Sequence, residues 1–138
     1  MIVEREFDGS KEDVFKVITK AIIEDVKICT DKDLKEKDIK VGFSYSKYLG
    51  GKKGSKAKAT IKKYTKPTDY ELKVKSDNGT TTISYKLLNQ DNATKLIYEE
   101  TFKTKDGKEV NSFFHNRSIK KRMNKYFDDI EAFITDKD

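Results

Sequence analysis

Between Ile39 and Phe102 the sequence alternates apolar and polar residues in five successive segments, which short turns separate. A period of two places every second side chain on the same face of a β-strand. Five consecutive strands joined by short turns form an antiparallel meander, which can leave one face in water. The alternation therefore predicts a sheet with one covered face. That face is predicted to carry Val41, Phe43, Tyr45, Ala57, Ala59, Ile61, Tyr70, Leu72, Val74, Thr81, Ile83, Tyr85, Leu87, Leu96, Tyr98, Glu100 and Phe102.

Turn residues divide these segments. Asn78-Gly79 is the strongest hairpin signal in the chain, because this dipeptide accepts the positive φ angles of a type I′ turn. The remaining predicted turns are residues 50–55, residues 66–68, residues 89–92 and Asp106-Gly107.

A short strand and a helix precede the meander. Residues 2–7 alternate, with Val3, Arg5 and Phe7 on one side. Ser10 followed by Asp13 is typical of a helix start, and an apolar stripe predicts a helix over residues 10–28.

The remaining segments are a polar connection and a final helix. Residues 30–38 hold one apolar side chain, Leu34, and are predicted to be a solvated connection with a helical turn. A helical period from Ile119 to Ile134 predicts a long helix over roughly residues 112–135, about 36 Å long. The order strand, helix, five strands, helix predicts an α+β fold with the helices on one side of the sheet.

Composition limits the classes of protein that fit. The 138 residues suit a single domain over residues 1–138, and no apolar run approaches the ~20 residues of a membrane helix. The first residues have neither the basic start nor the apolar stretch of a secretory signal, so we expect a cytoplasmic protein without an integral membrane segment. One Cys and one His exclude a disulfide framework and leave little for metal binding. The expected oligomeric state is a monomer or a homodimer.

The order of elements and the tail Ser112–Met123 carry a resemblance to a known superfamily. The chain resembles the helix-grip fold of the START, pollen-allergen and polyketide-cyclase superfamily, and its tail is similar to that of a small bacterial family of uncharacterised proteins there. The resemblance implies a curved antiparallel sheet of about six strands, wrapped around a long C-terminal helix, with a cavity between them. It implies no particular reaction, because a shared fold does not transfer a function.

The predicted inner face suggests a ligand site. Tyrosines on this face offer polar tips on apolar bodies, and Ala57 and Ala59 leave volume unfilled. Glu100 faces the helix and must be paired, hydrated or protonated. One interpretation is a pocket for a small, largely apolar ligand, with Phe113 and Phe114 as a gate at one end; the other is a core that the tyrosines fill. The predicted ligand-binding residues are Tyr45, Tyr70, Tyr85, Tyr98, Glu100, Met123 and Phe127.

Basic residues form two tracts in a chain of net charge +6. Residues 47–66 hold eight Lys and no acidic residue, and Arg117, Lys120, Lys121, Arg122 and Lys125 follow in the final helix. Such tracts attract polyanions, so an interaction module for an acidic partner or nucleic acid is the alternative function. A solvated surface that keeps sheet edges from pairing explains the same residues without a partner.

The sequence shows no catalytic pattern. His115 has no Ser or Cys partner in sequence, Cys29 suits a packing role, and no paired-carboxylate or metal-ligand spacing stands out. We therefore favour a non-enzymatic protein, with no cofactor and no metal site, over an enzyme, which would need a convergent set of polar residues that the sequence does not show.

Overall fold

The structure is a computed structural model that describes residues 1–49 and 55–135. Within these ranges it contains one six-stranded antiparallel sheet, two long helices and one short 3₁₀ helix. The elements in chain order are β1 (Ile2–Phe7), α1 (Lys11–Thr30), η1 (Glu36–Asp38), β2 (Ser44–Leu49), β3 (Ser55–Thr65), β4 (Asp69–Ser76), β5 (Gly79–Gln90), β6 (Ala93–Thr104) and α2 (Phe113–Thr135).

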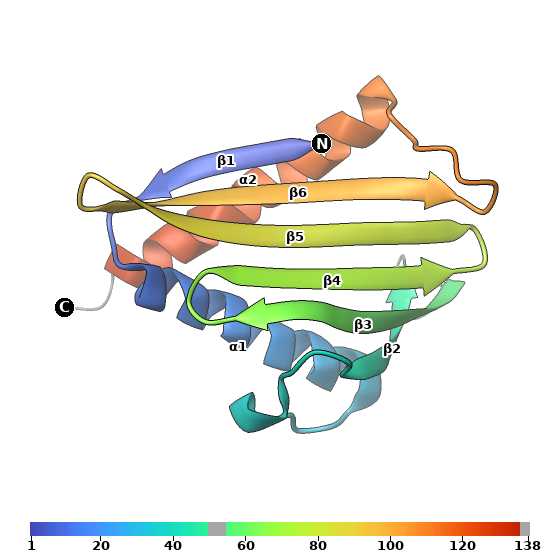
Figure 1. Cartoon of the computed structure of the whole chain (residues 1–138), viewed down its shortest axis with the longest axis horizontal. Helices are drawn as coiled ribbons and strands as arrows, with labels where there is room; N and C mark the ends of the chain where they lie inside the picture. The colour runs from blue at the N-terminus through green and yellow to red at the C-terminus, as the bar shows by residue number, and fades with distance from the viewer. Residues whose placement is uncertain (50–54, 136–138) are drawn as a thin grey trace.

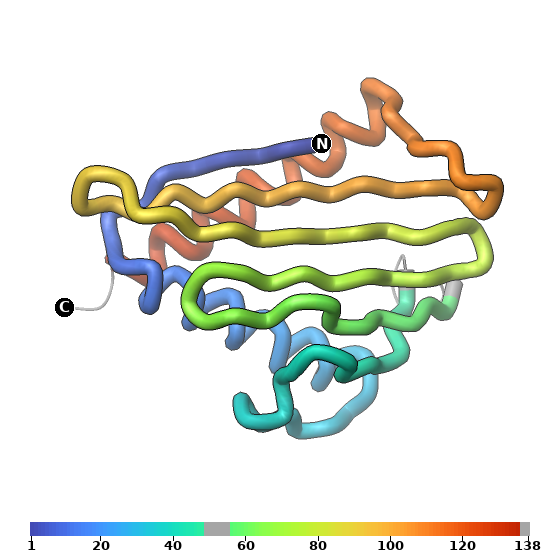
Figure 2. Tube along the Cα trace, viewed as in Figure 1, coloured from blue at the N-terminus to red at the C-terminus, as the bar shows by residue number. Residues whose placement is uncertain are grey.

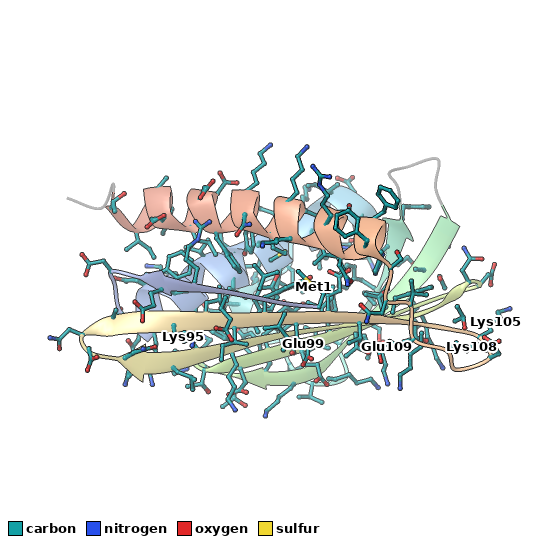
Figure 3. The ribbon with its side chains drawn as sticks, turned by 90° about the horizontal axis from the view of Figure 1, so that it is seen from above. Met1, Lys95, Glu99, Lys105, Lys108 and Glu109 are labelled. Carbon is teal, nitrogen blue, oxygen red and sulfur yellow. The ribbon has the colours of Figure 1, made fainter. Side chains whose placement is uncertain are left out.

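The strand order is β1-β6-β5-β4-β3-β2, so the predicted five-stranded meander is confirmed and the first strand extends it beside the last. The trace in Figure 2 shows β1 running along β6, where Ile2 lies opposite Glu99. Both helices lie on the same side of the sheet (Figure 1), and in Figure 3 side chains fill the space between the sheet and α2. The α+β helix-grip architecture predicted from the sequence is confirmed.

Helix α1 has the ends that its sequence favours. The Ser10 hydroxyl accepts a hydrogen bond from the Asp13 amide at 3.1 Å, as a helix N-cap does. The helix ends at Asp31, which has a φ of 60° and donates its amide hydrogen to the Lys27 carbonyl at 2.9 Å. Its apolar stripe is buried against the sheet: Val14, Phe15, Ile18, Ile22 and Val26.

The prediction that β2 begins at Ile39 is wrong. The strand begins at Ser44, and Val41 is 62% exposed instead of facing the core. Gly42 has a φ of 94°, and the Phe43 amide donates to the Lys40 carbonyl at 3.1 Å. This turn breaks the alternation, since a left-handed residue does not continue the pleat of a strand. Ile39 is buried all the same.

The turn between β4 and β5 also differs from its prediction. A hairpin forms there, but Asn78 does not have the positive φ of a type I′ turn. Positive φ angles occur instead at Asp91 (47°) and Asn92 (70°), in the turn between β5 and β6. Glycine is required at position 79 because the backbone of β6 lies too close for a side chain: a Cβ atom there would lie 2.1 Å from the Lys103 carbonyl oxygen. The predicted turn at residues 50–55 lies mostly outside the described residues.

Helix α2 covers the sheet with a buried face of Ile119, Met123, Phe127 and Ile130. The Phe127 ring meets Phe7 edge to face at 5.9 Å, and the Arg5 guanidinium lies 5.4 Å from the centre of the same ring. Arg5 also donates to Asp128 at 2.6 Å, which ties β1 to α2. Neither long helix of the described chain has the apolar length that crossing a bilayer requires.

A tyrosine-lined pocket as the candidate functional site

A pocket of about 230 Å³ lies between the inner face of the sheet and the two helices. Its apolar walls come from α1 and from strands β4 and β5: Ile18, Ala21, Ile22, Leu72 and Ile83. Its polar lining residues are Asp25, Lys47, Tyr70, Tyr85 and Tyr126. We call this the tyrosine pocket. A mostly apolar cavity with a few polar groups is the usual form of a small-molecule site.

A row of four tyrosines crosses the sheet beside this pocket. Tyr64, Tyr70, Tyr85 and Tyr98 are directly opposite one another on β3, β4, β5 and β6. Their successive ring centroids are 6.3, 5.7 and 5.0 Å apart. Strand register places the rings in this row, because directly opposed residues share one face of an antiparallel sheet.

The hydroxyl groups of the tyrosines divide into two sets. Tyr45 and Tyr98 donate to carboxylates, and Tyr64 shares a hydrogen bond of 3.0 Å with Thr19. The hydroxyls of Tyr70, Tyr85 and Tyr126 have no hydrogen-bond partner among the described residues. Every fully buried side-chain oxygen in the described ranges has a partner, so these three hydroxyls each border open space. The tyrosine pocket is the space that all three residues line.

Burial keeps these phenols neutral. Burial is the main cause that raises the pKa of Tyr70, Tyr85 and Tyr126 above the ordinary value of 10.0. Nearby acidic groups add to the effect: Asp25 for Tyr70, and Glu24 for Tyr126. At physiological pH each hydroxyl can therefore donate one hydrogen bond and accept others.

Asp25 forms the charged end of the pocket. Its Oδ2 accepts hydrogen bonds from the Tyr45 hydroxyl at 2.5 Å and from the Lys47 Nζ at 2.8 Å. Among the described residues, its Oδ1 has only the weak thiol donor of Cys29, at 3.8 Å. Burial, and next the bond to Asp25, raise the pKa of Tyr45, so this phenol also stays protonated. The ion pair leaves this end of the pocket without net charge.

A second buried carboxylate lies on β6. Glu100 is 8% exposed, and its Oε1 accepts hydrogen bonds from the Tyr98 hydroxyl and from Arg122 at 2.5 Å. The sequence left open whether this carboxylate is paired, hydrated or protonated, and the structure pairs it with an arginine of α2. Its role in ligand binding stays a prediction.

The structure brings together only part of the predicted ligand set. Tyr70 and Tyr85 line the tyrosine pocket, and Tyr45 reaches it through Asp25. Tyr45 itself lines a neighbouring pocket between the end of α1 and β2. Met123 and Phe127 are buried in the core and do not line the tyrosine pocket, and neither do Tyr98, Glu100, Phe113 or Phe114.

Sequence reasoning missed three of the polar lining residues: Asp25, Lys47 and Tyr126. Two of them had a readable signal. Asp25 follows Ile18 by seven positions and Ile22 by three, which places a carboxylate on the apolar stripe of α1. Lys47 follows Tyr45 by two positions and so shares its inward face.

The comparisons with known proteins agree with this architecture. The model of the family "Domain of unknown function (DUF3284)" matches residues 1–119. Comparison with curated protein sequences found no match.

Several solved structures have the same fold at low sequence identity. MLL2253 from Mesorhizobium loti is 14% identical over 100% of this chain and 98% of its own, with a TM-score of 0.69. Ara h 8.0201 is 16% identical over 98% of this chain and 96% of its own, with a TM-score of 0.67. CalU16 from Micromonospora echinospora is 16% identical over 98% of this chain and 75% of its own, with a TM-score of 0.64. These likenesses show the helix-grip fold, and the family match shows that this chain belongs to the DUF3284 family.

Proposed function

We propose that this protein binds a small, largely apolar ligand in the tyrosine pocket and does not transform it. One observation carries the proposal: three tyrosines with unbonded hydroxyls line a pocket whose other walls are mostly apolar. Apolar walls supply affinity, and a few fixed polar groups supply orientation. The charged residues of the site, Asp25 and Lys47, already pair with each other.

Size and polarity narrow the class of ligand. An apolar cavity of about 150 Å³ is enough to hold benzene, so a pocket of about 230 Å³ suits a body of one or two rings. A fully ionised ligand would add an unpaired charge to a site that is close to neutral, which is costly. We infer a neutral ligand that carries an oxygen or nitrogen within reach of Tyr70, Tyr85 or Tyr126.

Filling the pocket tests the proposal. Ala21→Leu adds bulk at a lining position of α1, and Ala132→Leu makes the same change at an exposed position of α2. The probe is 2-naphthol. Its binding is measured as a rise in the melting temperature of the protein and as a complex in native mass spectrometry. The wild type and Ala132→Leu should bind the probe, and Ala21→Leu should not. Equal binding by all three proteins, or no binding by the wild type, contradicts the proposal.

A lysine surface is the second candidate site. Lys58 and Lys75 lie directly opposite each other on β3 and β4, and neither has an ionic partner in the described residues. Like charges in this position destabilise a sheet, which favours an anionic partner. Within the tract over residues 47–66, Lys47, Lys63 and Lys66 form ion pairs, so this candidate is based on Lys58 and on Lys75 opposite it.

Salt dependence tests the second candidate. A mixed-sequence RNA should bind with an affinity that falls steeply as salt rises, and Lys58→Glu with Lys75→Glu should abolish this binding. Salt-independent binding, or binding that the two substitutions leave unchanged, excludes the lysine surface.

We also propose that residues 1–138 form a single domain, which acts in the cytoplasm as a monomer or homodimer. The pairing of β1 with β6 and the contact of Arg5 with α2 support one shared core. The free thiol of Cys29 suits a reducing compartment. One cooperative unfolding transition would support the single domain. The mass in solution distinguishes a monomer or homodimer from larger assemblies.

A further inference from the structure

Two adjacent phenylalanines at the start of α2 are exposed to solvent. Phe113 is 71% exposed and Phe114 is 79% exposed, and their rings meet edge to face at 5.6 Å. Figure 1 shows this end of α2 projecting beyond β1 and the edge of the sheet. The two rings therefore form an apolar point that no other described element covers.

Unpaired cations follow the two rings along the outward face of the helix. Arg117, Lys121 and Lys125 come three, seven and eleven positions after Phe114, which is the spacing of one helix face. Lys120 is exposed beside them. None of these four cations has an ionic partner among the described residues.

The other half of α2 behaves differently. Its acidic residues Asp128 and Glu131 both contact Arg5 of β1, at 2.6 and 3.5 Å. The fold thus pairs Asp128 and Glu131 of the acidic half, and in the basic half it pairs Arg122 with Glu100 but leaves the four cations named above without an ionic partner in the described chain.

This basic end is unfavourable in the isolated chain. Arg117, Lys121 and Lys125 repeat a like charge at intervals of four residues, which destabilises a helix. The first turn of α2 has no acidic residue, and the cations that follow oppose the helix dipole. A partner with negative charge and an apolar interior would relieve both the repulsion and the exposure of the rings.

We propose that this end of α2 docks on an anionic phospholipid bilayer. We name the six residues that form it the α2 tip: Phe113, Phe114, Arg117, Lys120, Lys121 and Lys125. The two rings enter the boundary between headgroups and acyl chains, Arg117 and Lys121 contact lipid phosphates, and the other two cations are attracted to the anionic surface.

The dimensions fit such a surface. At 1.5 Å per residue, Arg117 and Lys121 lie about 4.5 and 10.5 Å behind Phe114 along the helix axis. Apolar side chains of interfacial helices enter the boundary by about 5–10 Å, so these two cations reach the headgroups when the rings insert. A projecting apolar point needs no matching groove in a bilayer, whereas a folded acidic protein would have to provide one. We therefore favour a membrane.

A single tryptophan tests the insertion of the rings. The chain has no Trp, so Phe114→Trp introduces a unique fluorophore at the α2 tip. Ile28→Trp is the matched control, because Ile28 is 73% exposed on α1 and lies outside the α2 tip. With vesicles of equal parts phosphatidylcholine and phosphatidylglycerol, the emission of Phe114→Trp should shift to the blue and be quenched by brominated lipid. The Ile28→Trp emission should not change. No shift for Phe114→Trp, or equal shifts for both variants, overturns the proposal.

Sedimentation with the same vesicles tests the charges. Wild type should bind these vesicles and not bind phosphatidylcholine alone. Arg117→Glu with Lys121→Glu should weaken binding at least roughly tenfold, and Phe113→Ser with Phe114→Ser should abolish it. Lys73→Glu with Lys86→Glu, which makes the same charge change at exposed positions of β4 and β5, should leave binding intact. Binding that survives loss of both rings, that depends equally on the sheet lysines, or that occurs only with soluble polyglutamate excludes this membrane site.

Discussion

Tyr70 and Tyr85 lie directly opposite each other on β4 and β5, with ring centroids 5.7 Å apart and ring planes within 17° of parallel. Their stacked rings form one wall of the tyrosine pocket, while their hydroxyls have no partner in the described chain. The rings thus belong to the core of the protein, and the hydroxyls are free for a ligand.

Removal of these hydroxyls should affect binding more than stability. Tyr70→Phe and Tyr85→Phe keep the stacked rings and break no hydrogen bond within the described chain, so each should change the free energy of unfolding by less than about 0.5 kcal/mol. Tyr45→Phe should cost about 1.5–3 kcal/mol, because it removes a hydrogen bond to the Asp25 carboxylate. Urea unfolding of the three variants measures the contrast. Equal losses of stability would show that the two kinds of hydroxyl do not differ.

The contact between Glu100 and Arg122 should stabilise the packing of α2 on the sheet. Arg122→Ala leaves the Tyr98 hydroxyl as the one remaining hydrogen-bond donor to the buried Glu100 carboxylate in the described chain. The free energy of unfolding should therefore fall by about 1–3 kcal/mol. Lys120→Ala is the control, because Lys120 lies on the same helix and has no ionic partner among the described residues. This change should alter the free energy of unfolding by less than about 0.5 kcal/mol. Thermal unfolding compares the two variants. Similar melting temperatures would contradict a stabilising role for the pair.

Gly79 should be irreplaceable for steric reasons. An alanine Cβ there would lie 2.1 Å from the Lys103 carbonyl oxygen, which belongs to the neighbouring strand and cannot move freely. Gly79→Ala should therefore destabilise the protein by about 3 kcal/mol or more. Gly107→Ala is the control: its φ is 84° but its Cβ would meet open space, so it should cost only about 1 kcal/mol. Equal costs would show that backbone conformation, and not crowding, governs both positions.

Alkaline conditions should unfold the protein as its buried tyrosines ionise. Burial raises the pKa of Tyr70, Tyr85 and Tyr126 in the folded state, so the folded protein holds these protons more tightly than the unfolded chain does. Their contribution to stability is complete below about pH 10, the unfolded value, and is lost as the pH rises toward the folded values. Tyrosinate absorbance and circular dichroism should change together in this range. Full ionisation of all seven tyrosines without loss of structure would contradict the burial of these groups.

Periodicity predicted the sheet well because the alternation of apolar and polar residues within each strand shows which of its faces is buried. The alternation at Tyr70, Tyr85 and Tyr98 placed all three on the inner face, and the register then put them side by side. The prediction failed at Val41, where the left-handed Gly42 interrupts the strand. A pattern of apolar and polar residues does not report such a break.

The pocket itself was harder to predict. Periodicity shows which face of a helix is buried, but not which two buried faces leave a gap between them. The sequence predicts Met123 and Phe127 in the pocket because α2 faces the sheet, yet on the helix side the pocket is lined by residues of α1 and by Tyr126 of α2.

The central claim is that the tyrosine pocket holds a ligand, and ring resonances of assigned tyrosines test it most directly. On titration with 2-naphthol, the signals of Tyr70, Tyr85 and Tyr126 should shift together and saturate, while that of the exposed Tyr48 stays in place. Ala21→Leu should abolish the three shifts without unfolding the protein. If the three pocket signals do not move, or if Tyr48 moves as much as they do, the tyrosine pocket is not a binding site.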